Sequence, residues 1–290
     1  MNLNKMKGVV KMKLSILMDN NTIIDRYFAG EPGLSFLLEE KDTKILFDTA
    51  YSDAFLKNAE KMNKNLLDID YVVLSHGHLD HTWGLEPFSR KFVEDVFENK
   101  INTKKAKLVG HPGVLKEKYM DGNPIGISMS RGFLESVFKL ELKKESFWLS
   151  DKTVFLGEIP RKFTYENREP IGVVNNNGTE EDDYLLDDSA LAYKGEKGLV
   201  IITGCSHSGI CNIVEHAKKV TGIDNVSSII GGLHLLEAKT DVLEKTANYL
   251  SEENLDFLYP CHCTDLKSKI KLSEKINVKE AGSGMELEFD

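Results

Sequence analysis

The chain has 290 residues, a hydrophobic fraction of 41%, a charged fraction of 29% and a formal net charge of −9. These values are typical of a globular protein with a large core, and the acidic balance argues against a nucleic-acid partner, whose phosphates require a basic face. No stretch reaches the apolar length of a membrane span and residues 1–7 lack a signal peptide's apolar run, so a cytoplasmic protein without a membrane partner is expected.

The first half of the chain alternates short apolar segments with polar turns. In chain order, strands are predicted at residues 14–18, 34–39, 44–47, 71–74 and 107–110. After the third strand, a helical pattern places four apolar residues on one face: Phe55, Leu56, Ala59 and Met62. Residues 83–97 are predicted to be helical in part, with Pro87 near the start.

The middle of the chain differs from both ends. From about 120 to 183 it contains scattered glycines and short apolar pieces, which predict a loop-rich insertion with short strands. Loops of that length in a compact enzyme are usually functional and often cover a site. We therefore expect the insertion to lie over a functional site.

Strands and helices alternate in the last third of the chain. Strands are predicted at residues 199–203, 226–230 and 257–259, and helices at 210–220, 242–250 and from about 265. This alternation predicts parallel pairing, and ligand sites in such sheets lie at the carboxyl ends of the strands. Three histidine-bearing loops follow these ends, at residues 204–207, 231–234 and 261–263.

The segment His76-Gly77-His78-Leu79-Asp80-His81 directly follows the apolar run 71–74. Imidazole and carboxylate groups together suit zinc, iron or manganese. The spacing allows His76 and His78 to face one ion, and Asp80 and His81 to face a second. The alternative is a chance gathering of polar groups at a sheet edge, which is disfavoured because unpaired buried polar groups are costly. The segment therefore predicts a metal site.

Two strand-end histidines extend this candidate site. His207 lies in a glycine-flanked turn, and a ligand role is favoured over that of a satisfied loop histidine. His262 stands between Cys261 and Cys263. Because alternate residues of a strand end point to opposite faces, either the histidine or its two neighbours should bind, and the histidine is favoured.

The four cysteines are all in the last third, at Cys205, Cys211, Cys261 and Cys263. In a cytosolic chain, cysteines beside histidines indicate metal chemistry or plain burial rather than disulfides. For Cys205 two interpretations stay open, a metal ligand or a small buried residue beneath the site. Cys211 is expected in the core.

The remaining candidates have auxiliary roles. His234 is a candidate for substrate binding or acid–base chemistry, and His111, just before Pro112, for capping or substrate contact. Asp48, at the end of a strand, is expected to orient the metal loop through hydrogen bonds. His216 lies in the middle of a predicted helix and is expected at the surface.

These motifs resemble a known family. Residues 76–81 match the HxHxDH signature of the metallo-β-lactamase superfamily, and Ile45-Leu46-Phe47-Asp48-Thr49 matches its early strand-end aspartate. The resemblance covers nearly the whole chain. Further segments resemble one branch, named for a 7,8-dihydropterin-6-yl-methyl-4-(β-D-ribofuranosyl)aminobenzene 5'-phosphate synthase of methanopterin biosynthesis: residues 157–161, 187–191, 203–209, 231–235 and 262–264.

The resemblance implies a single α/β domain over residues 1–290, a four-layer αββα sandwich of two mixed sheets flanked by helices. It also implies two divalent metal ions, with zinc favoured and iron or manganese as alternatives. One ion would be held by His76, His78 and a third histidine, for which His207 is the candidate and His111 the reserve. The other would be held by Asp80, His81 and His262.

The chain departs from the family's commonest pattern at Cys205. The superfamily usually has Thr-Gly-Asp where this chain has Thr203-Gly204-Cys205, and that aspartate bridges both ions. Some β-lactamases place a cysteine ligand at this point. Metal identity and the filling of both positions therefore stay open.

The sequence favours a metal-dependent enzyme for a small phosphorylated metabolite, acting by metal-activated water or by displacement of pyrophosphate. Asp80 would orient the water, His234 would transfer a proton, and Arg161 would pair with a phosphate or else lie at the surface. The alternatives are a metal-dependent nuclease or phosphodiesterase, a di-iron redox or oxygen-sensing protein, and a metal-binding regulator without activity. Whether the chain forms a homo-oligomer stays open.

Overall fold

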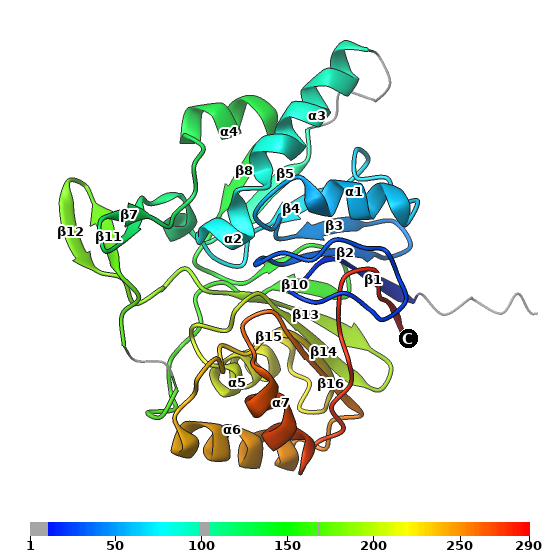
Figure 1. Cartoon of the computed structure of the whole chain (residues 1–290), viewed down its shortest axis with the longest axis vertical. Helices are drawn as coiled ribbons and strands as arrows, with labels where there is room; N and C mark the ends of the chain where they lie inside the picture. Colours follow the sequence, from blue (N-terminus) through cyan, green and yellow to red (C-terminus); the bar gives the residue numbers. More distant parts are fainter. Residues whose placement is uncertain (1–10, 99–104, 167–168) are drawn as a thin grey trace, which may run out of the picture.

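Two β-sheets pack face to face at the centre of the molecule (Figure 1). The computed structural model describes residues 11–98, 105–166 and 169–290. Residues 1–7, for which no signal peptide is expected, lie outside this range. Within the described part of the chain, no helix is long and apolar enough to cross a membrane.

The first sheet has seven strands in the order β17-β1-β2-β3-β4-β5-β8. In that order their bounds are Glu286–Phe289, Met12–Met18, Ser35–Glu39, Lys44–Phe47, Tyr71–Val73, Lys107–Gly110 and Lys139–Leu142. Neighbours from β17 to β3 are antiparallel, and neighbours from β3 to β8 are parallel. The strands predicted in the first half of the chain are all found here.

The second sheet has six strands in the order β16-β15-β14-β13-β10-β9. In that order their bounds are Phe257–Cys261, Val226–Gly232, Gly198–Thr203, Ala190–Gly195, Thr153–Phe155 and Phe147–Trp148. The pairs β14–β15 and β15–β16 are parallel, as the alternation of strands and helices predicts. The remaining pairs are antiparallel, so this sheet is mixed as well.

A small third sheet projects beside the other two, with β7, β11 and β12 at the left of Figure 1. Its order is β12-β11-β6-β7, with bounds Thr179–Asp182, Val173–Asn176, Lys118–Met120 and Asn123–Pro124. Strands β7, β11 and β12 fall inside the range 120–183 for which a loop-rich insertion is predicted. Strands β8, β9 and β10 fall in the same range but belong to the central sheets.

Helices cover the outer face of each central sheet (Figure 1). Helices α1 (Ala54–Lys61), α3 (Leu85–Phe97) and α4 (Arg131–Val137) pack on the first sheet. Helices α5 (Ile210–Thr221), α6 (Thr240–Glu252) and α7 (Leu266–Ser273) pack on the second. The result is the expected four-layer αββα sandwich, with α4 as a helix that the sequence pattern did not predict. Two short pieces complete the set, α2 (Leu79–Thr82) and a 3₁₀ turn (Pro112–Leu115).

Alternation of side chains along the strands builds these layers. On β2, Phe36 and Leu38 enter the core between the sheets, whereas Leu37 packs against the helices of the first layer. On β14, Val200 enters the core between the sheets and Ile201 packs against the helices of the second layer. Because these strands are buried on both faces, polar side chains can stand only at the strand ends. The functional groups therefore collect at one edge of the sandwich.

Candidate metal centre

Five strand ends supply the candidate centre. Asp48 follows β3, the segment 76–81 follows β4, Cys205 follows β14, His234 follows β15 and His262 follows β16. Because strands of both sheets end at this edge, side chains far apart in the sequence meet there. The structure brings together every metal ligand that the sequence predicts: His76, His78, Asp80, His81, Cys205, His207 and His262.

The turn after β4 sets the direction of the first ligands. His78 has an extended backbone and stands directly before α2, whose first turn carries Asp80 and His81. A Cβ atom at Gly77 would lie 2.7 Å from the carbonyl oxygen of Val114. Only glycine therefore allows the loop between the first two histidines to run this close to the neighbouring chain.

Three rings form one cluster, which we call the three-histidine cluster: His76, His78 and His207. Their ligand atoms all lie within 4.8 Å of one another. The Nε2 atoms of His76 and His207 are 3.2 Å apart, and Nε2 of His78 is buried without a hydrogen-bond partner. Burial lowers the pKa of His78 to about 4 and those of the other two rings well below their ordinary value. All three rings are therefore neutral at pH 7, the form that binds a metal.

A second group, which we call the carboxylate cluster, contains Asp80, His81 and His262. The Nε2 atoms of the two histidines are 3.1 Å apart, and Oδ2 of Asp80 lies 3.4 Å from Nε2 of His262. Cys205 connects the two clusters, because its Sγ is 3.2 Å from Nε2 of His81 and also groups with His76. It occupies the position between the clusters where the family's aspartate is expected.

Outer hydrogen bonds fix the tautomers of these rings. Nδ1 of His81 donates to Oδ2 of Asp48 at 2.6 Å, and Nδ1 of His262 donates to Oδ1 of Asn20 at 2.9 Å. Asp48 also accepts from the backbone N–H and the hydroxyl of Ser75, each at 2.7 Å. The Ser75 oxygen is therefore left to accept from Nδ1 of His76 at 2.9 Å. Asp48 has the orienting geometry that the sequence predicts.

These tautomers make the centre fit a cation. With their protons on Nδ1, His81 and His262 point two Nε2 lone pairs at each other across 3.1 Å, and two acceptors cannot share a hydrogen bond. Although burial opposes it, the carboxylates of Asp80 and Asp48 raise the pKa of His81 to about 9. The site thus requires positive charge, from a proton or a metal ion. Imidazole, carboxylate and thiolate donors suit zinc.

His111 lies away from the clusters. Its Nδ1 accepts from the backbone N–H of Gly113, and its Nε2 is 3.0 Å from Oε2 of Glu158. It therefore caps the 3₁₀ turn that begins at Pro112, in line with the capping role expected for it. Among the described residues it joins none of the ligand clusters, whereas His207 does, so the geometry favours His207 over His111 as the predicted third histidine.

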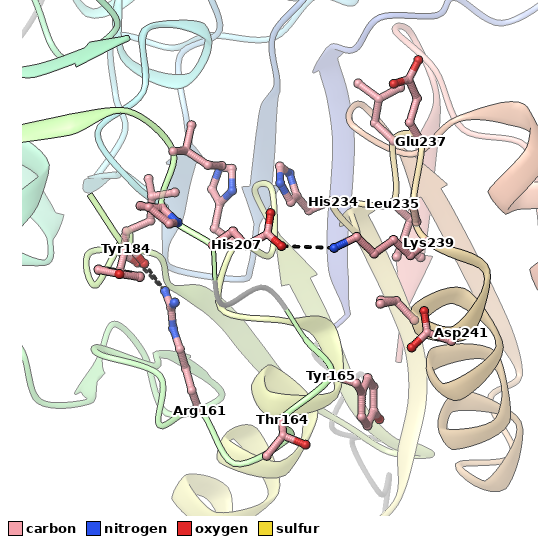
Figure 2. A pocket seen from close by; sticks show the side chains of 17 residues that line it. Arg161, Thr164, Tyr165, Tyr184, His207, His234, Leu235, Glu237, Lys239 and Asp241 are labelled. Atoms are coloured by element: carbon pink, nitrogen blue, oxygen red, sulfur yellow. Dashed lines mark hydrogen bonds and ion pairs between the residues drawn. The ribbon is translucent and has the colours of Figure 1, made fainter. Parts of the chain in front are cut away.

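His234 and Arg161 lie beside the centre. The His234 ring centroid is 4.3 Å from that of His207, and its buried Nδ1 has no hydrogen-bond partner. Arg161 donates to the carbonyl oxygens of Tyr184 and Leu185, so part of its guanidinium is engaged by backbone. Both side chains line a cavity of about 490 Å³, shown in Figure 2.

A second cavity, of about 550 Å³, opens directly over the metal ligands. Its walls are mainly apolar and include Tyr51, Met120 and Ile125, while His78, Asp80 and His262 form part of its floor. The two cavities share Ile171, His207, His234 and Leu236. The two cavities therefore adjoin at these four residues, as two lobes beside the centre.

Cys263 lies where the sequence pattern does not predict it. Strand alternation predicts that Cys263 diverges from His262, but the backbone φ of His262 is 51°, in the left-handed region. Cys261 enters the core between the sheets, whereas Cys263 groups with Cys205 and His262.

Two helical residues were predicted to lie outside the site. Cys211 is in the core as expected, but His216 is half-buried rather than at the surface, and its Nε2 donates to the carbonyl of Leu156.

Asp19 and Asn20 were also missed. Oδ1 of Asp19 accepts from the backbone N–H of His262 at 2.7 Å, and Asn20 holds the ring of the same histidine. Both residues directly follow β1. Because residues 14–18 are a predicted strand, the position of both residues at a strand end was a usable signal, as it was for Asp48.

Comparison with known proteins agrees with the fold. Residues 29–126 match the metallo-beta-lactamase superfamily. The 7,8-dihydropterin-6-methyl-4-(beta-D-ribofuranosyl)-aminobenzene-5'-phosphate synthase of Methanocaldococcus jannaschii is 30% identical over 289 residues, which span 95% of this chain and 94% of that protein. The chain belongs to the metallo-beta-lactamase superfamily.

Two further relatives are similar along nearly their whole length. An uncharacterized protein of Methanocaldococcus jannaschii is 32% identical over 265 residues, 91% of this chain and 95% of that protein. The crystal structure of Tm1679, described as a metal-dependent hydrolase of the beta-lactamase superfamily, superimposes with a TM-score of 0.80 at 27% identity, covering 95% of this chain and 98% of that one. This fold implies divalent metal binding, which the ligand clusters fit.

Proposed function

We propose that the protein is a metal-dependent enzyme that acts on a small phosphorylated metabolite, by hydrolysis or by displacing pyrophosphate from a pterin. The observation that carries the proposal is the pair of ligand clusters at the floor of a cavity large enough for a small molecule. The similarity to the dihydropterin synthase along 95% of the chain supports the second reaction.

The residues of each cluster have separate tasks. His76, His78 and His207 would hold one divalent ion, and the carboxylate cluster would hold the other, with zinc favoured by the donors. Such ions supply Lewis acidity, which activates a nucleophile and neutralises charge on a leaving group. Asp80 borders the cavity and can accept a hydrogen bond from the nucleophile, which would orient it toward the substrate.

His234 is placed for proton transfer. Burial lowers its pKa, but the neighbouring Cys263 sulfur and the carboxylates of Asp188 and Asp80 more than offset this and raise the pKa above its ordinary value. Its ring borders both lobes of the cavity. When protonated, an imidazole at this point would donate a proton to a leaving oxygen.

The two lobes suit a molecule with two chemically different parts. The apolar lobe over the metal ligands can take a planar ring, with Tyr51 and Met120 in contact with it. The second lobe is lined by Arg161 and by Lys239, whose Nζ is 3.1 Å from Oε1 of Glu169 (Figure 2). A phosphate in this lobe would compete with Glu169 for the ammonium of Lys239.

Assays on zinc-loaded protein test the proposal. A dihydropterin pyrophosphate with an arylamine ribotide would test displacement, and small phosphodiesters would test hydrolysis. We expect turnover in one of the two assays, and loss of it in His78→Ala but not in His216→Gln, a half-buried histidine on α5. Zinc-loaded protein that turns over neither kind of substrate would contradict the proposal.

A further inference from the structure

We propose that Cys263 is a metal ligand, and that together with Cys205 it gives the carboxylate cluster a thiolate side. The proposal rests on the proposed function only in requiring metal ions at this centre. It concerns which atoms hold the ion at His262, not which substrate is transformed. The spacing of Cys261, His262 and Cys263 predicts that His262 and Cys263 diverge, so it does not predict that both bind.

The backbone after β16 turns both residues toward the centre. Cys261 ends the strand and is fully buried in the core between the sheets. At His262 the φ angle of 51° ends the strand alternation, so His262 and Cys263 point to the same side. Ligand atoms of Cys205, His262 and Cys263 lie within 4.8 Å of one another, close enough to surround one ion.

The surroundings of Cys263 leave room for the sulfur and suit a thiolate. A Cβ atom at Gly232 would lie 2.7 Å from Sγ of Cys263, so the absence of a side chain at position 232 creates the space. The backbone N–H of His234 donates to the same Sγ at 3.2 Å. Hydrogen bonds to a ligand sulfur stabilise its negative charge and fix its direction, as outer partners of metal ligands do.

The segment is also held firmly in place. The backbone N–H of His262 donates to Asp19, a fully buried carboxylate, and the His262 ring donates to Asn20. These two contacts fix the residue that precedes Cys263. A ligand on such a fixed turn loses little conformational entropy when an ion binds.

The thiolate side would make the two metal positions chemically unequal. The three-histidine cluster offers three nitrogens and leaves a fourth tetrahedral position open, the arrangement of catalytic zinc sites. The carboxylate cluster would gain up to two sulfur donors and have no open tetrahedral position. Sulfur donors favour zinc over manganese or magnesium, so we also infer that the ion at His262 is zinc.

The alternative is that Cys263 is a neutral thiol that binds no ion. Its Sγ lies 3.5 Å from the carbonyl oxygen of Cys205, so a neutral thiol could donate there and serve only as packing. The two roles differ in an observable way, because only a ligand transfers charge to the metal. The test must therefore read the metal–sulfur bond directly.

Cobalt substitution gives the first measurement. In protein loaded with Co²⁺, we expect thiolate-to-cobalt charge-transfer absorption in the near ultraviolet. Cys263→Ser should lose about half of this absorption and Cys205→Ser the other half, since each removes one of two sulfur donors. Cys211→Ser, a buried cysteine on α5, should leave it unchanged. Full absorption in Cys263→Ser with cobalt still bound would overturn the proposal.

X-ray absorption at the zinc edge gives the second measurement and counts the sulfur donors directly. Because Cys205 lies between the clusters, Cys205 alone would give an average of about one half sulfur per zinc if it binds one ion and about one if it bridges both. Cys263 adds about one half in either case, at about 2.3 Å, so Cys263→Ser should lose this share. An average of one half or less in the wild type, or an unchanged average in Cys263→Ser with zinc bound, would overturn the proposal. A loss of sulfur in Cys263→Ser, found for a wild-type protein without activity, would support Cys263 as a ligand and refute only the proposed function.

Discussion

The two ligand clusters are held in place by different means. In the carboxylate cluster, the outer nitrogens of His81 and His262 are bound by the side chains of Asp48 and Asn20. The backbone N–H of His262 is bound as well, by Asp19. In the three-histidine cluster, the ring of His76 is bound by the hydroxyl of Ser75, and carboxylates hold the backbone of the ligand loops. Asp187 accepts a hydrogen bond from the backbone N–H of Gly77, and Asp188 accepts one from the backbone N–H of Ser208.

The comparison distinguishes two effects of an outer hydrogen bond: one orients the imidazole ring of a ligand, and the other fixes the backbone that carries the ligand. A carboxylate on a ring nitrogen increases the basicity of the ligand and so acts on metal affinity. A carboxylate on the backbone fixes where the loop runs and so acts on stability. We therefore expect substitutions around the carboxylate cluster to change metal binding, and substitutions around the three-histidine cluster to change folding first.

The largest effect should follow loss of a ligand from either cluster. We expect His78→Ala, which leaves two nitrogens in its cluster, to lower the metal content from about two ions per chain to about one, and His262→Ala to weaken binding of the other ion. Activity should fall by more than about 100-fold, since changes outside the ligands already cost about 10- to 100-fold. Elemental analysis of purified protein measures the metal content, and competition with a chelator measures the affinity. A full complement in His78→Ala, or an unchanged affinity in His262→Ala, would remove that residue from the ligand set.

Lys118 should matter next, because it supports the backbone of the three-histidine cluster. Its buried Nζ lies 2.7 Å from Asp183 and 2.8 Å from Asp187. Lys118→Met leaves these buried carboxylates without a cation, and we expect the free energy of unfolding to fall by about 3–5 kcal/mol. Urea denaturation of metal-free protein measures it. The matched change Lys116→Met, at an exposed side chain, should cost no more than about 0.5 kcal/mol.

A smaller effect is expected at Asp48, which acts on the ring of His81. Asp48→Asn removes the charge that orients this ligand, and the affinity for the second ion should fall by about 10- to 100-fold. Competition with a chelator measures the affinity. Asp53→Asn, an exposed aspartate just before α1, provides the control. Equal affinities in the two variants would show that Asp48 serves the fold alone.

The smallest effect is a pH dependence of stability from Asp187. Burial raises the pKa of this carboxyl, but the ammonium of Lys118 outweighs burial and holds the pKa below its ordinary value. The folded state therefore binds fewer protons than the unfolded state below about pH 4, so this stability is present above pH 4 and lost as the pH falls.

Urea denaturation of metal-free protein between pH 5 and pH 3 would detect this loss. A single group contributes at most about 1.4 kcal/mol per pH unit. Asp187→Asn should show a correspondingly smaller slope than the wild type. Identical slopes in the two proteins would assign the acid sensitivity to other carboxyls.

Much of the centre could be predicted from local sequence, because its ligands stand at the ends of apolar runs. The segment 76–81 follows β4, and His207 and His262 follow strands that alternate with helices. Cys263 could not be predicted in this way, because its direction depends on one left-handed backbone angle at His262. That angle is held by contacts with Asp19 and Asn20, which are more than 240 residues away in the chain.

The middle of the chain was harder to interpret for a similar reason. Strands β8, β9 and β10 have two to four residues each, too few to show a period. They are stabilised by pairing within the two central sheets, β8 with β5, β9 with β10 and β10 with β13. Pairing with strands that are distant in the sequence determines their structure, and this pairing cannot be recognised from the short segments themselves.

The added sheet gives the cavity a wall that is separate from the sandwich. Its strands pair with neither central sheet, yet Met120 and Ile125 line the space over the metal ligands. The backbone N–H of Leu79 also donates to the carbonyl of Ile125, so this wall is tied to the turn that carries Asp80. Redesign of β6 and β7 could therefore change which molecules are admitted while the ligand-bearing strands keep their sequence.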